Sequence, residues 1–194
     1  MGKAGFDVVP LTPERWPDLE DLFGPKGACY GCWCNHFRMP QKQRMPLLGE
    51  GARLLFEERV RNGPPPGVIA YDGETCVGWL QVGPRRDVSE WNNPRRASTP
   101  LPDALAEDPR NWAASCFFVR KQWRGQRVTA TLLDGAIDFA RASGARLLEA
   151  AAMDHELKRS SEGLYVGPER IFLRAGFSEV ARQKPGRPLM RLAL

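Results

Sequence analysis

The sequence predicts a mixed α/β fold with helices around one sheet, and two stretches carry most of that prediction. Residues 67–82 contain two strand-like runs joined at Asp72-Gly73, a pair typical of a tight β-hairpin. Residues 113–153 contain a nearly unbroken apolar run, then apolar residues at helical spacing, then a second apolar run. This order of strand, helix and strand is that of an α/β sheet.

The first third of the chain predicts one strand and two helices. Residues 6–11 form a short strand candidate. A helix should follow and end near Gly24, because Thr12 can cap it and Pro13 can occupy its first turn. A second helix is expected over about residues 50–61, before a run of prolines that forbids its continuation. Helical spacing in this second segment is seen at Leu54, Leu55 and Glu58.

The middle of the chain predicts the hairpin and a long connection. The hairpin strands are expected at residues 67–71 and 76–82, with positive backbone angles supplied by Asp72-Gly73. Residues 84–111 are rich in Pro, Asn and Arg, and a connection of that length is usually functional or contains a short helix. We interpret it as a candidate lid.

From Trp112 onward the predicted strands and helices alternate. The apolar run 113–119 suits a central strand, and the repeat over 128–142 predicts a helix that Gly144 ends in the left-handed conformation. The remaining elements are expected to be a strand at 146–153, a short helix at 168–174, and closing strands at 177–180 and 189–194.

Composition and charge limit the class of protein. A chain of 194 residues that is 42% hydrophobic can bury a core as one domain over residues 1–194. No stretch reaches the ~18 apolar residues of a membrane span and no secretory signal begins the chain, so we expect a cytoplasmic protein without a membrane partner. The net charge of +5 is scattered, which disfavours nucleic-acid binding but would attract a small polyanion. Five cysteines, an odd number, are typical of a reduced chain.

One segment concentrates the features of a phosphate-binding site. The apolar strand that ends at Val119 runs into a basic turn with Gly125, and the amphipathic helix begins directly afterwards, near Val128. Free backbone N–H groups and a helix N-terminus therefore point at one place. Any strand-to-helix turn can hold a glycine and exposed arginines, so this segment alone leaves phosphate binding and an ordinary turn equally open.

Residues 123–128 (WRGQRV) resemble the acetyl-CoA signature of the GNAT N-acetyltransferase superfamily, Arg/Gln-x-x-Gly-x-Gly/Ala, which follows a strand. With Arg124 in the first position, Arg127 and Thr129 stand where the family has its glycine and its glycine or alanine; Arg127 could add a charged contact of its own. Residues 171–180 resemble the family's late helix, Gly-Phe corner and following strand. The order of elements matches over essentially the whole chain, which implies the GNAT-like fold: a mixed, mostly antiparallel central sheet flanked by helices.

The resemblance implies an enzyme that transfers an acetyl group from its cosubstrate acetyl-CoA directly to an amine, without a metal. A main-chain N–H near Phe118 would stabilise the oxyanion, and coenzyme A would leave as a thiol. The alternative is a catalytically silent acyl-CoA-binding protein, because Phe172 stands where many members have a tyrosine near the departing sulfur. The acceptor amine stays open, and a homodimer is compatible with either alternative. The residues implied in cofactor binding are Phe118, Val119, Arg124, Gly125, Gln126, Arg127, Val128 and Thr129.

Two residues are candidates for the proton transfers. Glu149 is the only carboxylate in the strand 146–153, which in the family architecture would splay from the strand 113–119 to admit the pantetheine arm. It is the candidate general base, and an ordinary edge or surface glutamate is the alternative. Tyr165, on the loop before the last helix, could replace the missing tyrosine as proton donor, with a packing role as its alternative. Asp154-His155 is a third option.

Three cysteines and a histidine crowd into residues 29–36. Structural zinc sites usually take ligand pairs from separated elements, and this chain has no second pair. The thiols can instead pack with aromatic neighbours, or the segment can form a wall of the acceptor pocket, as the corresponding segment commonly does in the family. A small zinc-dependent nucleic-acid binder is the weakest alternative. The residues expected to contact the acceptor are Trp33, Cys34, Asn35 and, from the long connection, Trp91.

Overall fold

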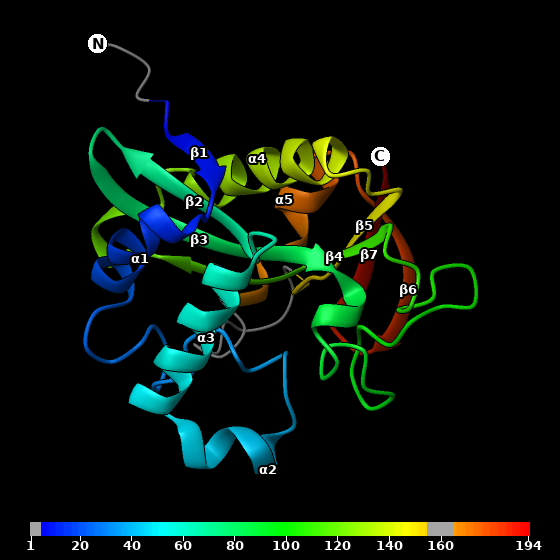
Figure 1. Cartoon of the computed structure of the whole chain (residues 1–194). Coiled ribbons are helices and arrows are strands. Elements are labelled where there is room, and N and C mark those ends of the chain that lie inside the picture. The colour runs from blue at the N-terminus through cyan, green and yellow to red at the C-terminus, as the bar shows by residue number, and fades with distance from the viewer. Residues whose placement is uncertain (1–4, 155–164) are drawn as a thin grey trace.

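The computed structural model describes residues 5–154 and 165–194, in which seven strands form one sheet flanked by helices (Figure 1). The strand order is β1-β2-β3-β4-β5-β7-β6, and every neighbouring pair is antiparallel except β4 and β5. The strands are β1 (Asp7–Pro10), β2 (Gly67–Asp72), β3 (Thr75–Pro84), β4 (Asn111–Val119), β5 (Leu147–Ala151), β6 (Ser178–Lys184) and β7 (Arg187–Ala193). The helices are α1 (Trp16–Phe23), α2 (Gln41–Arg44), α3 (Glu50–Asn62), α4 (Val128–Ala142) and α5 (Glu169–Arg174), with short 3-10 turns η1 (Pro13–Arg15), η2 (Met45–Leu47), η3 (Arg85–Asp87) and η4 (Lys121–Trp123). The predicted mixed, mostly antiparallel sheet is confirmed.

The first helical segment begins and ends where the sequence predicts, but its predicted cap is wrong. The chain leaves α1 at Gly24, whose φ of 64° is left-handed. The side chain of Thr12 makes no capping bond; its hydroxyl oxygen accepts a hydrogen bond from Arg15 at 3.0 Å instead. The short turn η1 that follows Thr12 satisfies the backbone without it, since the Arg15 N–H donates to the Thr12 carbonyl at 3.0 Å.

The hairpin of β2 and β3 forms as predicted, with a different turn. Asp72 pairs with Thr75, so the two connecting residues are Gly73 and Glu74. Of these residues only Gly73 has a positive φ, at 59°. The expectation that Asp72 and Gly73 both supply positive angles is therefore wrong, because a tight turn with glycine in its first position needs only that one.

The helix α3 occupies the predicted segment but buries a different face. Leu54 is 51% exposed, whereas Phe56 is fully buried and packs edge-on against Trp79 of β3, with ring centroids 5.9 Å apart. The buried residues of the helix are Ala52, Phe56 and Val60. The larger aromatic contact decides how the helix is rotated. The short helix α2, which precedes it, was not predicted.

The two faces of the sheet carry different helices. Figure 1 shows α4 and α5 along one face and α1 with α3 on the other. The helix α4 approaches β3 closely at Gly78, where an added Cβ would lie 2.8 Å from Val128 and 2.9 Å from Leu132. This contact places the N-terminus of α4 beside the end of β4. None of the helices in the described part of the chain has the length and apolar character needed to cross a membrane.

The long connection over residues 84–111 is packed against the sheet and is not a free lid. Arg85, Trp91 and Ser98 are 0%, 1% and 2% exposed. Trp91 belongs to an apolar cluster with residues of β4, β5 and β7. An open lid would keep these side chains in solvent, so the interpretation as a lid is corrected: in this structure the segment packs on one face of the sheet.

Candidate active site

The sheet opens between β4 and β5. The two strands pair only over residues 111–113 and 147–149, although β4 continues to Val119 and β5 to Ala151. Beyond Ala113 the side of β4 that faces the gap therefore has no strand partner. Unpaired strand edges offer backbone donors and acceptors to an extended ligand. The predicted splay of the two strands is confirmed.

A bulge in β4 accounts for the divergence. Gln81 of β3 pairs with Cys116 while Val82 pairs with Ala114, so Ser115 has no opposite residue. The buried Gln81 donates from Nε2 to the Ser115 hydroxyl at 2.9 Å, and its Oε1 has no hydrogen-bond partner among the described residues. An extra residue in one strand bends it and increases its local twist. The bulge thus turns β4 away from β5 just after their last pair.

The turn between β4 and α4 presents a group of free backbone donors. Gly125 and Arg127 have φ angles of 80° and 69°, in the left-handed region that non-glycine residues rarely adopt. The N–H groups of Gly125, Arg127, Val128 and Thr129 have no partner within residues 5–154 and 165–194. Together with the positive end of the α4 dipole, they form a cradle of the kind that binds phosphate.

The side chains around this cradle are basic and exposed. Arg124 donates from Nε to the Val119 carbonyl at 3.1 Å, which ties its guanidinium to the strand end, and its terminal nitrogens have no partner among the described residues. The ring of Phe118 points elsewhere and packs edge-on against Phe23 of α1, with centroids 5.3 Å apart. The Phe118 ring is thus directed toward α1. The exposed side chains between β4 and α4 are Lys121, Gln122, Arg124, Gln126 and Arg127.

Tyr165 lies close to three parts of the chain: Cys29, Cys116 of β4, and Arg124 in the turn before α4. A side-chain hydrogen bond with Cys29, followed by burial, raises the pKa of Tyr165 to about 12. Arg124 and Cys116 are also close enough for their charges to act on it. At this pKa the hydroxyl keeps its proton throughout the neutral range and can donate a hydrogen bond there, although it is a weaker acid than an ordinary tyrosine.

A surface hollow of about 610 Å³ opens beside Tyr165. Ala28, Cys29, Tyr30 and Gly31 line one side of it. The loop 27–34 to which they belong has an unusual backbone, since four residues other than glycine have φ between 42° and 66°: Ala28, Tyr30, Trp33 and Cys34. Such angles are costly and persist where the surrounding structure imposes them, frequently at ligand sites. The hollow is lined by Pro25, Lys26, Ala28, Cys29, Tyr30, Gly31, Leu48, Gly49 and Tyr165.

The four residues expected to contact the acceptor are buried, which leaves their predicted role a prediction. The exposed fractions are 5% for Trp33, 3% for Cys34, 2% for Asn35 and 1% for Trp91. The indole of Trp33 stacks on Trp16 at 5.9 Å, and the Cys34 thiol accepts a hydrogen bond from Trp79 Nε1 at 3.0 Å. Trp33, Cys34 and Asn35 thus anchor the loop 27–34 in the core, whereas Ala28, Cys29 and Tyr30 line the hollow.

Glu149, the candidate base, is the centre of a buried ion pair. Its side chain is 0% exposed and accepts hydrogen bonds from Arg85 and, at 2.8 Å, from Arg191. Arg191 also binds Asp103, at 2.6 Å. Both carboxylate oxygens of Glu149 are therefore occupied by guanidinium donors. This geometry argues against Glu149 as the general base.

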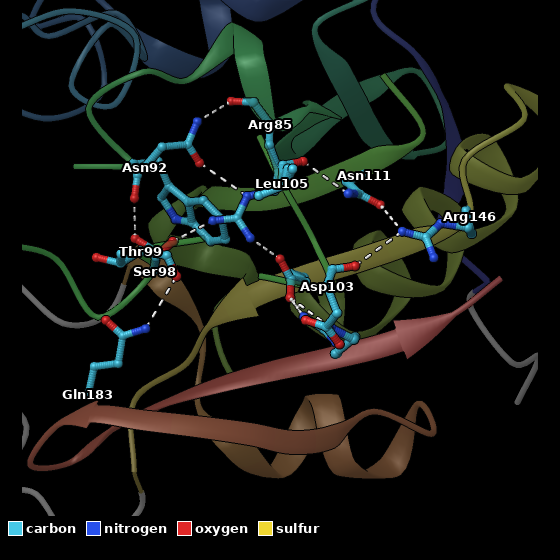
Figure 2. A network of polar contacts seen from close by, with 12 residues as sticks. Arg85, Asn92, Ser98, Thr99, Asp103, Leu105, Asn111, Arg146 and Gln183 are labelled. Atoms are coloured by element: carbon cyan, nitrogen blue, oxygen red, sulfur yellow. Dashed lines mark hydrogen bonds and ion pairs between the residues drawn. The ribbon is translucent and has the colours of Figure 1, made fainter. Parts of the chain in front are cut away.

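The same ion pair holds the fork of the sheet. Figure 2 shows the guanidinium of Arg85 among residues of the long connection: its Nε donates to Asn92 Oδ1 at 3.1 Å, and a terminal nitrogen donates to the Ser98 carbonyl at 2.5 Å. Arg85 also stacks over the ring of Trp91, 4.7 Å from its centroid. Glu149 pairs across the strands with Ala113, the last residue before the gap. The network therefore fixes the point at which β4 and β5 separate.

The third candidate for proton transfer is not assigned a role. Asp154 is ion-paired with Arg182 at 2.6 Å. His155 lies outside the described residues. Phe172, at the position of the family tyrosine, is fully buried between Phe117 and Phe177, with centroids 6.2 and 5.4 Å away. It offers no hydroxyl. Of the two tyrosines that line the hollow, Tyr30 and Tyr165, it is Tyr165 that lies near Arg124 and Cys116.

Cys34 and Cys76 are buried packing residues, whereas Cys29 lines the hollow beside Tyr165. All five are free, and burial raises the pKa of Cys32 to about 11 and that of Cys34 well above its usual range. Burial likewise lowers the pKa of His36 to about 4. Within the described residues, no three side chains of the metal-binding types are grouped so that they could hold a metal ion. The thiols of Cys32 and Cys34 are thus neutral, and Cys34 lies within an aromatic cluster.

Sequence reasoning missed three residues of the site. Gln81 and Ser115 form the bulge, and the polar Gln81 within the apolar run 76–82 was a signal that could have found it. Cys29 was assigned to the cysteine cluster, and no local signal shows that it contacts Tyr165, which is far away in the sequence.

The chain matches the model of the acetyltransferase (GNAT) family over residues 33–166, and it belongs to that family. No match was found among curated proteins. Solved structures with a similar fold include a GNAT-family acetyltransferase from Listeria monocytogenes, with a TM-score of 0.56, 16% identity, and coverage of 100% of this chain and 99% of that one. The PaiA N-acetyltransferase from Thermoplasma acidophilum, solved in complex with coenzyme A, has a TM-score of 0.53 and 11% identity over 97% of this chain and 99% of that one. A ribosomal-protein-alanine N-acetyltransferase from Brucella melitensis has a TM-score of 0.51 and 18% identity over 97% and 99%.

Proposed function

We propose that this chain is an N-acetyltransferase that moves the acetyl group of acetyl-CoA to an amine by direct attack. The observation that carries the proposal is the gap between β4 and β5, which runs from the cradle of free N–H groups at α4 to Tyr165. Family membership supports acetyl transfer, and the coenzyme A complex of the PaiA enzyme supports the choice of cosubstrate.

The cradle binds the pyrophosphate of the cosubstrate in this proposal. The N–H groups of Gly125, Arg127, Val128 and Thr129 donate to its oxygens, and the guanidinium of Arg124 adds charge. Arg127 compensates for the missing signature glycine in two ways, since it already has the left-handed φ that glycine would supply and it brings a positive charge. The unpaired edge of β4 accepts the pantetheine arm.

The chemistry then requires few protein groups. The amine attacks the thioester carbonyl, a C–N bond forms, and a main-chain N–H near Phe118 stabilises the oxygen that becomes negative. The C–S bond breaks next, and Tyr165 donates its proton to the departing thiolate. The attacking nitrogen gives up one proton to solvent and solvent returns one to Tyr165, so the products are the amide and the free thiol. Because both oxygens of Glu149 are already paired, we assign it no proton and expect the acceptor to react as the free amine.

Tyr165→Phe is expected to lower kcat by about 10- to 100-fold, because the departing thiolate loses its proton donor. The affinity for coenzyme A should change little, since the hydroxyl isn't part of the cradle. Tyr71→Phe is the matched control: it removes a hydroxyl that donates to Asp18 at 2.5 Å, away from the gap. Steady-state rates and calorimetric binding of coenzyme A measure both quantities. An unchanged kcat in Tyr165→Phe would remove Tyr165 from the mechanism.

A second candidate function is a binding protein that retains the cleft and has lost catalysis. The occupied carboxylate of Glu149 and the buried Phe172 are the observations that favour it. The two functions separate in one assay of thiol release from acetyl-CoA across a panel of amines. An enzyme releases thiol in proportion to the acetylated amine, whereas a silent protein binds coenzyme A and releases none.

A further inference from the structure

Three arginines converge beside the gap on the face of the sheet opposite α4. Arg96 lies over the ring of Phe37, 5.0 Å from its centroid. Phe37 belongs to the apolar cluster that contains Ala151 at the end of β5. Arg187 donates to the carbonyls of residues 151 and 152 at 3.1 and 3.0 Å, so its guanidinium lies at the same strand end.

The third arginine, Arg44, lies close enough to His36 for its charge to act on the imidazole. The imidazole of His36 packs edge-on against Phe37 at 4.7 Å. Burial lowers the pKa of His36, and the positive charges of Arg44 and Arg96 lower it further. Burial and the charge of Arg96 also lower the pKa of Arg187. Arg96 and Arg187 therefore lie at one apolar patch, and Arg44 is close enough for its charge to act on His36 beside it.

The three arginines have few carboxylates near them to balance their positive charge. The nearest carboxylate to Arg96 within the described ranges is Glu90, at 4.0 Å, and neither Arg44 nor Arg187 has an ion-pair partner there. The buried Nε of Arg44 has no hydrogen-bond partner among the described residues. Elsewhere the chain pairs its half-buried arginines closely, as with Arg53, which contacts three carboxylates within 3.0 Å. Burying like charges together without a counter-charge is costly unless a ligand supplies one.

The three arginines and the cradle that would bind the cosubstrate lie on opposite faces of the sheet. Side chains alternate along β5, so Ala150 faces the α4 side and Ala151 faces Phe37. The cradle belongs to the turn at the start of α4, whereas the arginines lie on the face of Phe37. An anion held by the arginines is thus part of a molecule other than the pyrophosphate.

We propose that Arg44, Arg96 and Arg187 form an anion-binding site that selects acetyl acceptors carrying a carboxylate or a phosphate group in addition to the amine. The inference rests on the proposed acetyl transfer, because the gap beside the arginines is where the acceptor must meet the thioester. Arginine suits either anion, since its planar donors bind carboxylate and phosphate oxygens in pairs. The acceptor amine would point into the gap while its anion stays at the arginines.

The test uses pairs of acceptors that differ only in the anion. One arm compares amino acids with their carboxamides, and the other compares aminoalkyl phosphates with the matching amino alcohols. We expect the anionic member of at least one pair to have the higher kcat/KM by 10-fold or more. Arg96→Gln and Arg44→Gln should each raise KM for that member by about 10- to 100-fold and leave KM for its neutral partner nearly unchanged. Arg61→Gln, on the exposed side of α3, is the matched control and should change neither.

A second measurement, of anion binding, tests the site even when no amine of the panel reacts. Protein saturated with coenzyme A is titrated with inorganic phosphate and with acetate, and the thermal shift is compared between the wild type and the two variants. A shift that both variants lose supports the site. Equal KM changes for neutral and anionic acceptors, or anion shifts that are absent or the same in all proteins, would overturn it. Coenzyme A binding in the same samples shows whether the proposed function itself has failed.

Discussion

Glu149→Gln is expected to lower the free energy of unfolding by about 3–5 kcal/mol, because it leaves Arg85 charged and fully buried without its counter-charge. For a chain of this size that loss corresponds to a fall in Tm of roughly 6 to 20 °C. Denaturant titration and calorimetry measure the two quantities. The gap between β4 and β5 should become less ordered as well, since Glu149 is the last residue of β5 that pairs with β4.

Two companion variants make this result specific. Glu50→Gln breaks an exposed pair with Arg53, whose nitrogen lies 2.7 Å away, and should cost less than about 1 kcal/mol. The double variant Arg85→Met with Glu149→Leu should be more stable than Glu149→Gln, since it leaves no unpaired Arg85. A Glu149→Gln protein as stable as the wild type would contradict the buried ion pair. Loss of the acidic limb from its pH-rate profile would restore Glu149 as the base.

Arg124→Glu is expected to weaken coenzyme A binding by roughly 100-fold, because it removes a charged donor from the cradle and places a carboxylate beside the pyrophosphate. Arg124 is exposed, so the fold should be unaffected. Arg141→Glu makes the same charge change at the far end of α4, where the side chain is 52% exposed, and should leave the affinity unchanged. Calorimetry compares the two. Equal affinities in both variants would move the pyrophosphate away from this turn.

The sequence predicts those elements whose signals are local. The helix α4 has the bounds expected from its apolar spacing, and Gly144 beyond it has the expected left-handed φ, 77°. The phosphate turn is similarly local, since a strand, a basic turn and a helix that follow one another directly must place free N–H groups together.

Features that depend on distant residues could not be predicted in this way. Glu149 meets Arg85 and Arg191, which are 64 and 42 residues away, and no pattern within β5 announces such partners. An apolar run with one carboxylate looks the same whether that carboxylate is catalytic or paired. The left-handed angles of Trp33 and Cys34 likewise come from tertiary packing, because neither residue type favours them. The burial of the residues expected to contact the acceptor could not be predicted for the same reason.

The most direct test of the central claim is the thermal shift of the purified chain with acetyl-CoA. A ligand that binds only the folded state, at 100 times its Kd, adds about 2.7 kcal/mol. For a domain of this size the Tm should then rise by roughly 5 to 10 °C, and Arg124→Glu should lose most of that rise. No shift with millimolar acetyl-CoA or coenzyme A, in protein shown by mass spectrometry to carry no bound cofactor, would contradict both the acetyltransferase and the binding protein.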